Sequence, residues 1–426
     1  MKGVIFSSLI ASAGAFPFVM NVPGVDSSAI QAERRRIRRQ QPGQGPGSAA
    51  ECPFNANHVP AAPITSQYPY NNAKNGRKGN EKGGYQVPAP GDTAHQFVPP
   101  NPDTDIRGPC PGLNVAANHN FLAHDGITTF NELVDAQQNI FNVGYDLANI
   151  LALLGLTLTA GDLVTTKLSI GCDATSRTSV NPTLTGSEPG LSGHNKFEAD
   201  TSLTRNDFFT GQGDNFSFNG TLFGMMTETT GGNYDLEGMA LYRQQRWFQS
   251  RDENPNFYFG PLTLLQFGAA SFLYEVMPSG TRGYAPDVET ISSFYGAQRE
   301  YDGSWSFNNA EQIPPNWTNR VEPYDNSKVV AEILKMYSLH PVEFGGNTAD
   351  GTFNVINFSN IITEGKLEPN LDPKVASCLL YMLATERVPT YLNSVLTPSV
   401  EALSLVLTKL SGTSFANSGC LRPVTK

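Results

Sequence analysis

The chain contains the stretch Arg107-Gly108-Pro109-Cys110-Pro111-Gly112-Leu113-Asn114, in which a cysteine stands between two prolines. An apolar periodic run follows directly and predicts a helix over residues 113–122. Because proline fixes φ at about −65° and suits the first turn of a helix, Cys110 should lie on a rigid bend at a helix N-terminus. The N–H groups and partial positive charge there favour a thiolate, so we expect a lowered pKa for Cys110. Such a thiolate could be a nucleophile, a redox centre or a ligand for a soft metal, and these residues alone leave all three open.

A second polar stretch follows further along the chain, His194-Asn195-Lys196-Phe197-Glu198-Ala199-Asp200-Thr201-Ser202-Leu203-Thr204-Arg205-Asn206-Asp207. The first stretch, with Ala117-Asn118-His119-Asn120-Phe121-Leu122 after it, resembles the proximal loop of the fungal haem-thiolate peroxidases, the family of chloroperoxidase and the unspecific peroxygenases. The second stretch resembles that family's other motif, Glu-Gly-Asp or Glu-His-Asp followed by a serine. Two motifs in this order are a more specific signal than either alone, and the resemblance covers residues 100–275.

The resemblance implies haem b as the cofactor, with Cys110 as the axial ligand of the haem iron. A thiolate ligand pushes electron density onto the iron and favours cleavage of an O–O bond. With hydrogen peroxide as the oxidant, no reductase partner is required. We therefore expect a secreted haem-thiolate peroxidase that uses hydrogen peroxide to oxidise or oxygenate a small organic molecule.

The resemblance also implies a magnesium ion beside a haem propionate, bound by Glu198, the backbone carbonyl of Ala199, and Ser202. In a helical turn Glu198 and Ser202 would share a face, and a set of oxygen ligands suits Mg²⁺. The alternative interpretation is that these polar residues cap the start of a helix.

One departure from the family concerns the group that moves the proton of the peroxide. The middle residue of the second motif is Ala199, where the family has His, which assists a distal glutamate, or Gly, which accompanies an arginine and a glutamate on a later helix. An ungapped match of that helix places Thr263 and Ala269 at the two positions, and neither can transfer a proton. Glu275 is the nearest carboxylate on the helix, but it should face elsewhere. The acid–base residue is therefore unassigned.

These departures favour a specialised oxidation of an aromatic or polyketide-like compound, such as a step in fungal secondary metabolism. The alternatives are a broad-specificity peroxygenase, a haloperoxidase, or a non-catalytic haem-binding glycoprotein. An unrelated cysteine hydrolase would use Cys110 as the nucleophile and His119 or His194 as the base. We expect both histidines to be structural. The phenylalanines at 208, 209, 257, 259 and 267 should pack the core, and some could line the haem pocket.

The composition is that of a soluble secreted protein. Among 426 residues, 39% are hydrophobic and the formal net charge is −10, which argues against nucleic acid as a partner. Forty glycines and 30 prolines indicate long loops between helices. No segment is long and apolar enough to be expected to cross a membrane.

The N-terminal residues predict secretion and processing. Residues 1–15 combine Lys2, an apolar run and the small residues Ala13-Gly14-Ala15, as in a signal peptide. The basic cluster Glu33-Arg34-Arg35-Arg36-Ile37-Arg38-Arg39-Gln40 predicts a processing site, so residues 16–39 would be a propeptide; the alternative is a solvated charge run. Residues 40–105 are rich in Pro and Gly and predict an irregular extension of a single domain at 106–425. Glycosylation sequons, which fit secretion, begin at Asn215, Asn219, Asn316 and Asn357.

The remaining cysteines can be sorted by context. We expect a disulfide between Cys378 and Cys420, because it would pin the C-terminal tail of a secreted chain, and because the larger peroxygenases have a C-terminal disulfide at a similar place. Cys52 precedes a proline but lacks the preceding proline and the helical run, so it is not the expected metal ligand. Cys172 has no obvious partner except Cys52, and it could instead be a buried thiol.

Apolar spacing of three and four predicts a mainly helical protein without a strand ladder. The expected helices are residues 113–122, 128–143, 145–158, 161–169, 201–209, 216–226, 235–250, 260–274, 328–338, 371–385 and 388–410. Residues 175–191 and 276–328 are expected to be irregular, and residues 345–360 a loop or small hairpin.

Overall fold

The computed structural model describes residues 52–53, 55–159, 161–172, 190–195, 197–308, 310–348, 350–390, 394–396 and 398–421. The expected signal peptide and propeptide lie outside these residues, as does most of the loop expected at 175–191. Within the described ranges, no helix is long and apolar enough to cross a membrane.

Helices dominate the described part of the chain, as the sequence predicted. They are α3 (Pro111–Asn118), α4 (Phe130–Phe141), α5 (Tyr145–Leu158), α6 (Gly220–Thr229), α7 (Leu236–Glu253), α8 (Leu264–Glu275), α9 (Val288–Tyr295), α10 (Asn326–Leu339), α11 (Pro373–Ser377), α12 (Leu379–Thr385) and α13 (Val400–Leu410). Short 3-10 turns occur at η2 (Pro261–Thr263), η3 (Gly280–Arg282) and η4 (Ser414–Ala416).

The strands are short and antiparallel, and they form small hairpins between the helices. The pairs are β1 (Ile127–Thr129) with β2 (Lys167–Ser169), β4 (Ala297–Arg299) with β5 (Trp305–Phe307), β8 (Ile362–Thr363) with β9 (Lys366–Leu367), and β10 (Val388–Thr390) with β11 (Ser394–Leu396). A three-stranded sheet has the order β3 (Tyr258–Phe259), β6 (Gly345–Asn347), β7 (Phe353–Val355). Strands β6 and β7 thus form a small hairpin, one of the two expectations for residues 345–360.

Side-chain caps explain where several helices begin. Thr129 and Glu132 form a reciprocal capping box at the start of α4. Asp235, Asp287 and Asp325 accept backbone N–H bonds at the starts of α7, α9 and α10. Each cap satisfies a donor that the helix itself leaves unpaired, so these starts are set locally by the sequence.

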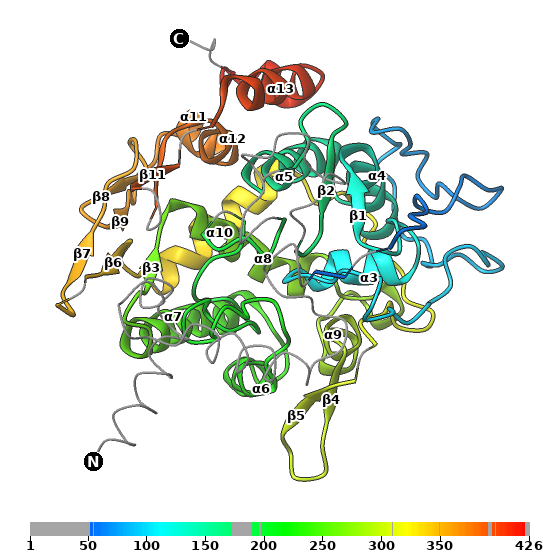
Figure 1. Cartoon of the computed structure of the whole chain (residues 1–426), viewed down its shortest axis with the longest axis horizontal. Coiled ribbons are helices and arrows are strands. Elements are labelled where there is room, and N and C mark those ends of the chain that lie inside the picture. The colour runs from blue at the N-terminus through cyan, green and yellow to red at the C-terminus, as the bar shows by residue number, and fades with distance from the viewer. Residues whose placement is uncertain are drawn as a thin grey trace.

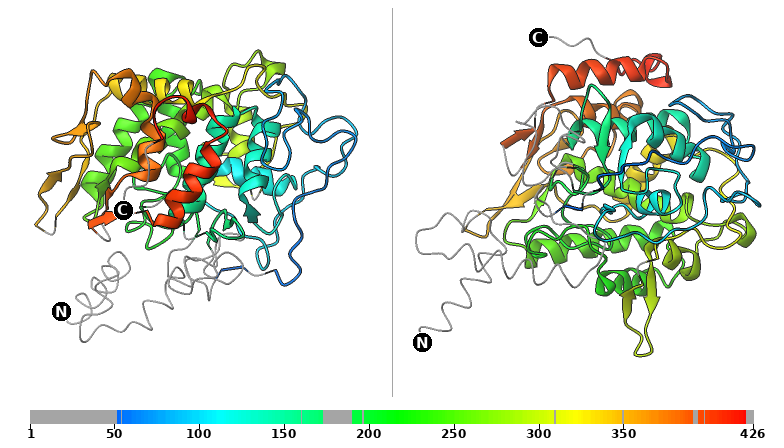
Figure 2. Two further views of the ribbon diagram at one scale, coloured as in Figure 1. Left: turned by 90° about the horizontal axis from the view of Figure 1, so that it is seen from above. Right: turned by 45° about the vertical axis from the view of Figure 1, so that its right-hand side comes forward.

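Helices α7, α8 and α10 pack against one another, and α5 packs against α4, α12 and α13. Figure 1 shows α8 and α10 in the middle of the molecule, with α3 at its right and α13 at the edge beside α5. The extension from residue 55 to 105 runs over the outside of α3 and α4, and the β4–β5 hairpin projects from the body in both Figure 1 and Figure 2. In its described part the extension has no helix or named strand, and it is attached through side chains such as Asn71, which donates to the Gln138 carbonyl at 2.7 Å.

Two expected helices were wrong, and a third was confirmed only in its C-terminal half. Residues 161–169 form a turn in which the Asp162 carboxylate accepts from Val164 N, followed by β2. Residues 201–209 form a loop, because Asp207 accepts from the Thr201 N–H at 3.0 Å and closes a turn instead of a helix. Residues 388–410 divide into the β10–β11 hairpin and α13, with Pro398 immediately before the N-cap residue Ser399.

Two smaller differences are an additional helix and a break within an expected one. The segment 276–328, expected to be irregular, contains α9. The helix expected over 371–385 is interrupted at Cys378, which ends α11 and precedes α12.

The structure contains two disulfides and one free cysteine. Cys378 is joined to Cys420, and Cys52 to Cys172. The possibility that Cys172 is a buried thiol is therefore wrong. Cys110 is the free cysteine.

Candidate active site

Cys110 lies at the N-terminus of α3, where the sequence predicted it. It is the N-cap residue, with extended φ and ψ of −89° and 109°, and Pro111 begins the helix. The Asn114 side chain closes the turn: its Nδ2 donates to the Gly108 carbonyl and its Oδ1 accepts from the Gly108 N–H, both at 2.9 Å. Gly108 is required here, because a Cβ atom would lie 1.8 Å from the carbonyl oxygen of Ile170. The bend is therefore held by contacts on both sides of the cysteine.

The lowered pKa expected for the Cys110 thiol is wrong for the protein without haem. Burial raises the pKa of the thiol above its usual value, and the Leu113 and Gly112 N–H groups and the charge of Arg205 offset this only in part. Desolvation penalises the thiolate more than the helix N-terminus stabilises it. Cys110 in the protein alone is thus less acidic than the helix-terminus argument predicted.

Cys110 opens on a cavity that offers about 240 Å³ to the centres of water-sized molecules. Most of the lining side chains are apolar and come from α4, α5, β2, α8, α10, α12 and the loop that contains Leu191 and Phe197: Leu133, Phe141, Leu147, Leu151, Leu168, Leu191, Phe197, Phe272, Val329, Ile333 and Leu380. A Cβ atom on Gly112, which also lines the cavity, would lie 3.9 Å from Cys110 Sγ. A side chain at this position would thus be in van der Waals contact with the sulfur.

The three expected magnesium ligands line the same cavity: Glu198, Ala199 and Ser202. Glu198 Oε2 accepts from His194 Nδ1 at 3.1 Å, whereas Glu198 Oε1 is buried and has no hydrogen-bond partner in the described ranges. Burial raises the pKa of Glu198, and His194 opposes the shift. A buried carboxylate oxygen without a hydrogen-bond partner, at a cavity that Ser202 also lines, fits a bound cation.

The carbonyl of Ala199 is held by a neighbouring helix. It accepts a hydrogen bond of 2.6 Å from Gln266 Nε2 on α8, and Gln266 Oε1 accepts from Thr201 Oγ1 at 3.2 Å. A carbonyl oxygen has two lone pairs, so this bond leaves one for a metal.

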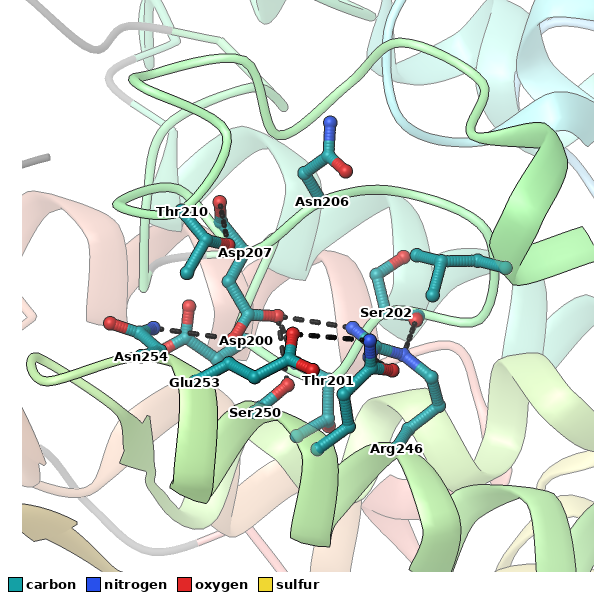
Figure 3. A network of polar contacts seen from close by, with 12 residues as sticks. Asp200, Thr201, Ser202, Asn206, Asp207, Thr210, Arg246, Ser250, Glu253 and Asn254 are labelled. Atoms are coloured by element: carbon teal, nitrogen blue, oxygen red, sulfur yellow. Dashed lines mark hydrogen bonds and ion pairs between the residues drawn. The ribbon is translucent and has the colours of Figure 1, made fainter. Parts of the chain in front are cut away.

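A buried polar network supports the loop that carries these residues. Asp207 Oδ1 accepts from Thr201 N, Ser250 Oγ and Arg246 Nη2, at 3.0, 3.0 and 3.2 Å. Asp207 Oδ2 accepts from Asn254 Nδ2 at 3.2 Å. Figure 3 shows Arg246, Ser250 and Asn254 converging on Asp207 from the end of α7. The network fixes the loop without a helix, so the alternative that these residues cap a helix is wrong.

The structure explains why no acid–base residue emerged from the sequence. Ala269 lines the cavity, but Thr263 does not, and the Thr263 hydroxyl donates to the carbonyl of Gly260. Glu275 forms an ion pair of 2.8 Å with Arg320 and is not among the lining residues. Among the described residues that line this cavity, Glu198 is the only carboxylate.

The histidines have structural contacts. His119 Nδ1 donates to the His95 carbonyl at 2.9 Å and its Nε2 accepts from Ile313 N at 3.1 Å. His194 contacts Glu198 and stacks on Phe208, with ring centroids 4.7 Å apart. No histidine of the described ranges lines the cavity with Cys110, which does not support a Cys–His hydrolase.

The five phenylalanines considered in the sequence analysis pack the core, and none of them lines the cavity. The aromatic rings at its wall are instead Phe141, Phe197, Phe272 and Tyr295.

Sequence reasoning missed three polar residues: Gln266, which bonds the Ala199 carbonyl, and Arg205 and Glu311, which form a buried ion pair of 3.1 Å behind the Cys110 turn. Gln266 and Arg205 lie within stretches that were inspected, but nothing in their spacing indicated their contacts. Glu311 lies in a segment expected to be irregular and carries no sequence signal.

The fold and the site together define a mainly helical protein with a free thiol at the wall of an apolar cavity. A family model described as "Peroxidase, family 2" matches residues 95–322, and the chain belongs to this family of haem-thiolate peroxidases, which includes chloroperoxidase and the aromatic peroxygenases. The resemblance seen in the sequence is thereby confirmed.

Individual relatives are between 28% and 35% identical to this chain over the aligned residues. An aromatic peroxidase fscJ of Fusarium equiseti is 28% identical over 348 residues, covering 76% of this chain and 78% of the relative. The dothistromin biosynthesis peroxidase dotB of Dothistroma septosporum is 30% identical over 285 residues, covering 65% and 67%. An aromatic peroxygenase of Coprinellus radians is 35% identical over 230 residues, covering 52% and 85%.

Proposed function

We propose that this protein is a secreted peroxidase that uses hydrogen peroxide to oxidise or oxygenate an aromatic or polyketide-like compound in fungal secondary metabolism. Family membership supports a haem-thiolate enzyme acting with hydrogen peroxide on organic substrates. The relative named for dothistromin biosynthesis supports the secondary-metabolic role. The observation that carries the proposal is the free thiol of Cys110 facing a large, mainly apolar cavity.

Bound to Cys110, haem would supply the iron centre at which peroxide is activated. The chain's own contribution is to hold the sulfur at the end of α3 and to surround the centre with apolar side chains. Apolar walls exclude water and favour a substrate with a large hydrophobic surface. Glu198, the Ala199 carbonyl and Ser202 would hold Mg²⁺ at the same cavity.

Proton transfer is where this chain departs from a broad peroxygenase. Heterolysis of peroxide is assisted by a group that takes a proton from one oxygen and returns it to the other. At the positions matched to the family's arginine and glutamate, the chain has a buried threonine and an alanine. This observation favours a slow or specialised peroxidase, and it keeps a non-catalytic haem-binding protein as the second candidate. Halide oxidation would require the same proton transfer.

Secretion is supported by the two disulfides, which persist in oxidising compartments. For glycosylation, the exposed Asn316 and Asn357 are suitable sites, whereas the half-exposed Asn219 caps α6 and donates from Nδ2 to Asn206 Oδ1 at 2.7 Å. The Asn215 side chain is buried and donates to the Ser192 carbonyl at 3.0 Å, so burial argues against a glycan at that sequon.

The proposal is tested by the spectrum of the purified protein, followed by turnover. The reduced, carbon-monoxide-treated protein should show the Soret band of a thiolate-ligated haem, and Cys110→Ala should lose it. Peroxide-dependent oxidation of an aromatic model compound should then separate an enzyme from a haem-binding protein. A protein that stays colourless when supplied with haemin, or that retains haem unchanged in Cys110→Ala, would contradict the proposal.

A further inference from the structure

A buried ion pair lies behind the turn that carries Cys110. Arg205 donates from Nε to the backbone carbonyl of Pro109, and from Nη2 to Glu311 Oε1, both at 3.1 Å. The side chains of Arg205 and Glu311 are only 1% and 2% exposed. Arg205 therefore joins the second motif to the residue immediately before the cysteine.

Glu311 has further contacts with the same structure. Its Oε1 also accepts from Asn114 Nδ2 at 3.1 Å, and its backbone carbonyl accepts from Asn118 Nδ2 at 2.8 Å. Asn114 is the residue whose side chain closes the turn at Gly108. Glu311 thus contacts both side chains that hold the Cys110 turn, those of Asn114 and Arg205.

This arrangement differs from ordinary core packing. A buried carboxylate and guanidinium lose their hydration, and an apolar pair of the same size would fill the space without that loss. The contacts of the two side chains are directed at Gly108–Pro109 and α3, on either side of Cys110.

We propose that Glu311 is a positioning residue for Cys110, holding the thiol-bearing turn through Asn114 and Arg205. The role in haem ligation rests on the proposed function, whereas the role in holding the turn concerns the protein alone. Glu311 is therefore testable with and without haem.

The test compares Glu311→Ala and Glu311→Gln with wild type. The alanine variant removes both accepted bonds, whereas glutamine keeps an acceptor oxygen and removes the charge. Asp92→Asn is the matched control, because Asp92 is a buried carboxylate whose Oδ2 likewise accepts from two side chains, Tyr70 OH at 2.7 Å and His95 Nδ1 at 2.9 Å.

In the haem-loaded protein, Glu311→Ala should convert most of the thiolate-type Soret band of the reduced carbon-monoxide complex to a shorter-wavelength form. Glu311→Gln should keep the band and raise the haem reduction potential, since a negative charge near the iron is lost. Asp92→Asn should lower the melting temperature and change neither band nor potential. If Glu311→Ala keeps the wild-type band and potential, the proposal is wrong.

In the protein without haem, the readout is the rate of Cys110 alkylation by iodoacetamide, because the other cysteines are in disulfides. Glu311→Ala should change this rate by tenfold or more, Glu311→Gln, which keeps the acceptor oxygen, should change it less, and Asp92→Asn should stay within about twofold of wild type. If wild type binds no haem but the alkylation rates differ as expected, the proposed function fails and the positioning role stands. If the rates are equal, the positioning role fails.

A third variant covers the case in which Glu311→Ala does not fold. Arg205→Lys keeps the positive charge, but its single ammonium cannot reproduce the two separate bonds of the guanidinium to Pro109 and Glu311. It should show part of the loss of the thiolate-type band and a faster alkylation. Wild-type values in both measurements would contradict the proposal.

Discussion

Gln266 Nε2 on α8 donates a hydrogen bond of 2.6 Å to the backbone carbonyl of Ala199. The bond ties the helix opposite the expected metal ligands to the loop that carries them. Ala269 lies three positions after Gln266 on the same helix, lines the same cavity and is exposed to it. This face of α8 therefore has room for a larger side chain near the reaction site.

Ala269→Glu should increase peroxide-dependent oxidation of a model aromatic compound, because it supplies a carboxyl group on the α8 side of the cavity, whose lining residues include none. General acid–base catalysis contributes about 10²-fold or more, so we expect an increase of about that size in kcat/KM for peroxide. Steady-state kinetics with matched haem content provide the measurement. Ala269→Gln, which has the same size but cannot move a proton, is the control, and equal rates in the two variants would exclude a proton-transfer effect.

Glu198→Gln should lower the magnesium content of the purified holoprotein, because an amide oxygen is a weaker ligand for Mg²⁺ than a carboxylate. Elemental analysis after dialysis against a chelator measures this. Haem should also be lost faster to an apoprotein acceptor. Glu275→Gln, whose carboxylate pairs with Arg320 away from the cavity, is the control. Unchanged magnesium in Glu198→Gln would mean that the ion, if bound, lies elsewhere.

His119 should make the protein less stable in acid. Burial lowers the pKa of His119 from 6.5 to about 4, so between these values the unfolded chain binds a proton that the folded protein does not. The contribution of His119 to the free energy of unfolding is therefore fully present above pH 6.5. It is lost as the pH falls towards 4, which lowers the free energy of unfolding by about 3 kcal/mol. Urea unfolding at pH 7 and pH 4.5 should show a smaller difference in His119→Gln than in wild type. The same substitution at His340, at the C-terminal end of α10, is the control.

Replacing Cys378 and Cys420 by serine should lower the free energy of unfolding. The bridge closes a loop of 42 residues, for which the loss of chain entropy in the unfolded state corresponds to about 4 kcal/mol. Replacing Cys52 and Cys172, which are 120 residues apart, should cost about 5 kcal/mol. Thermal unfolding of the two double variants measures both effects. Melting temperatures equal to that of wild type would show that the bridges do not constrain the unfolded chain.

Several features could be predicted because neighbouring residues encode them. The position of Cys110 at a helix start follows from the flanking prolines, and the starts of α4, α7 and α10 follow from their caps. The boundary errors arose where tertiary contacts replaced helix formation, as in the loop held by Asp207. The pKa of Cys110 was misjudged for the same reason, because burial depends on the whole fold.

By itself, the sequence determined the mainly helical class, the thiol at the N-terminus of α3 and the family, since each depends on short stretches of contiguous residues. Only the tertiary structure decided that Cys52 pairs with Cys172, that Asn215 is buried, and that Glu311 reaches Asn114 and Arg205. Glu311 is separated from these two partners by 197 and 106 residues. Such contacts depend on how the helices pack, and no local spacing of residue types encodes that packing.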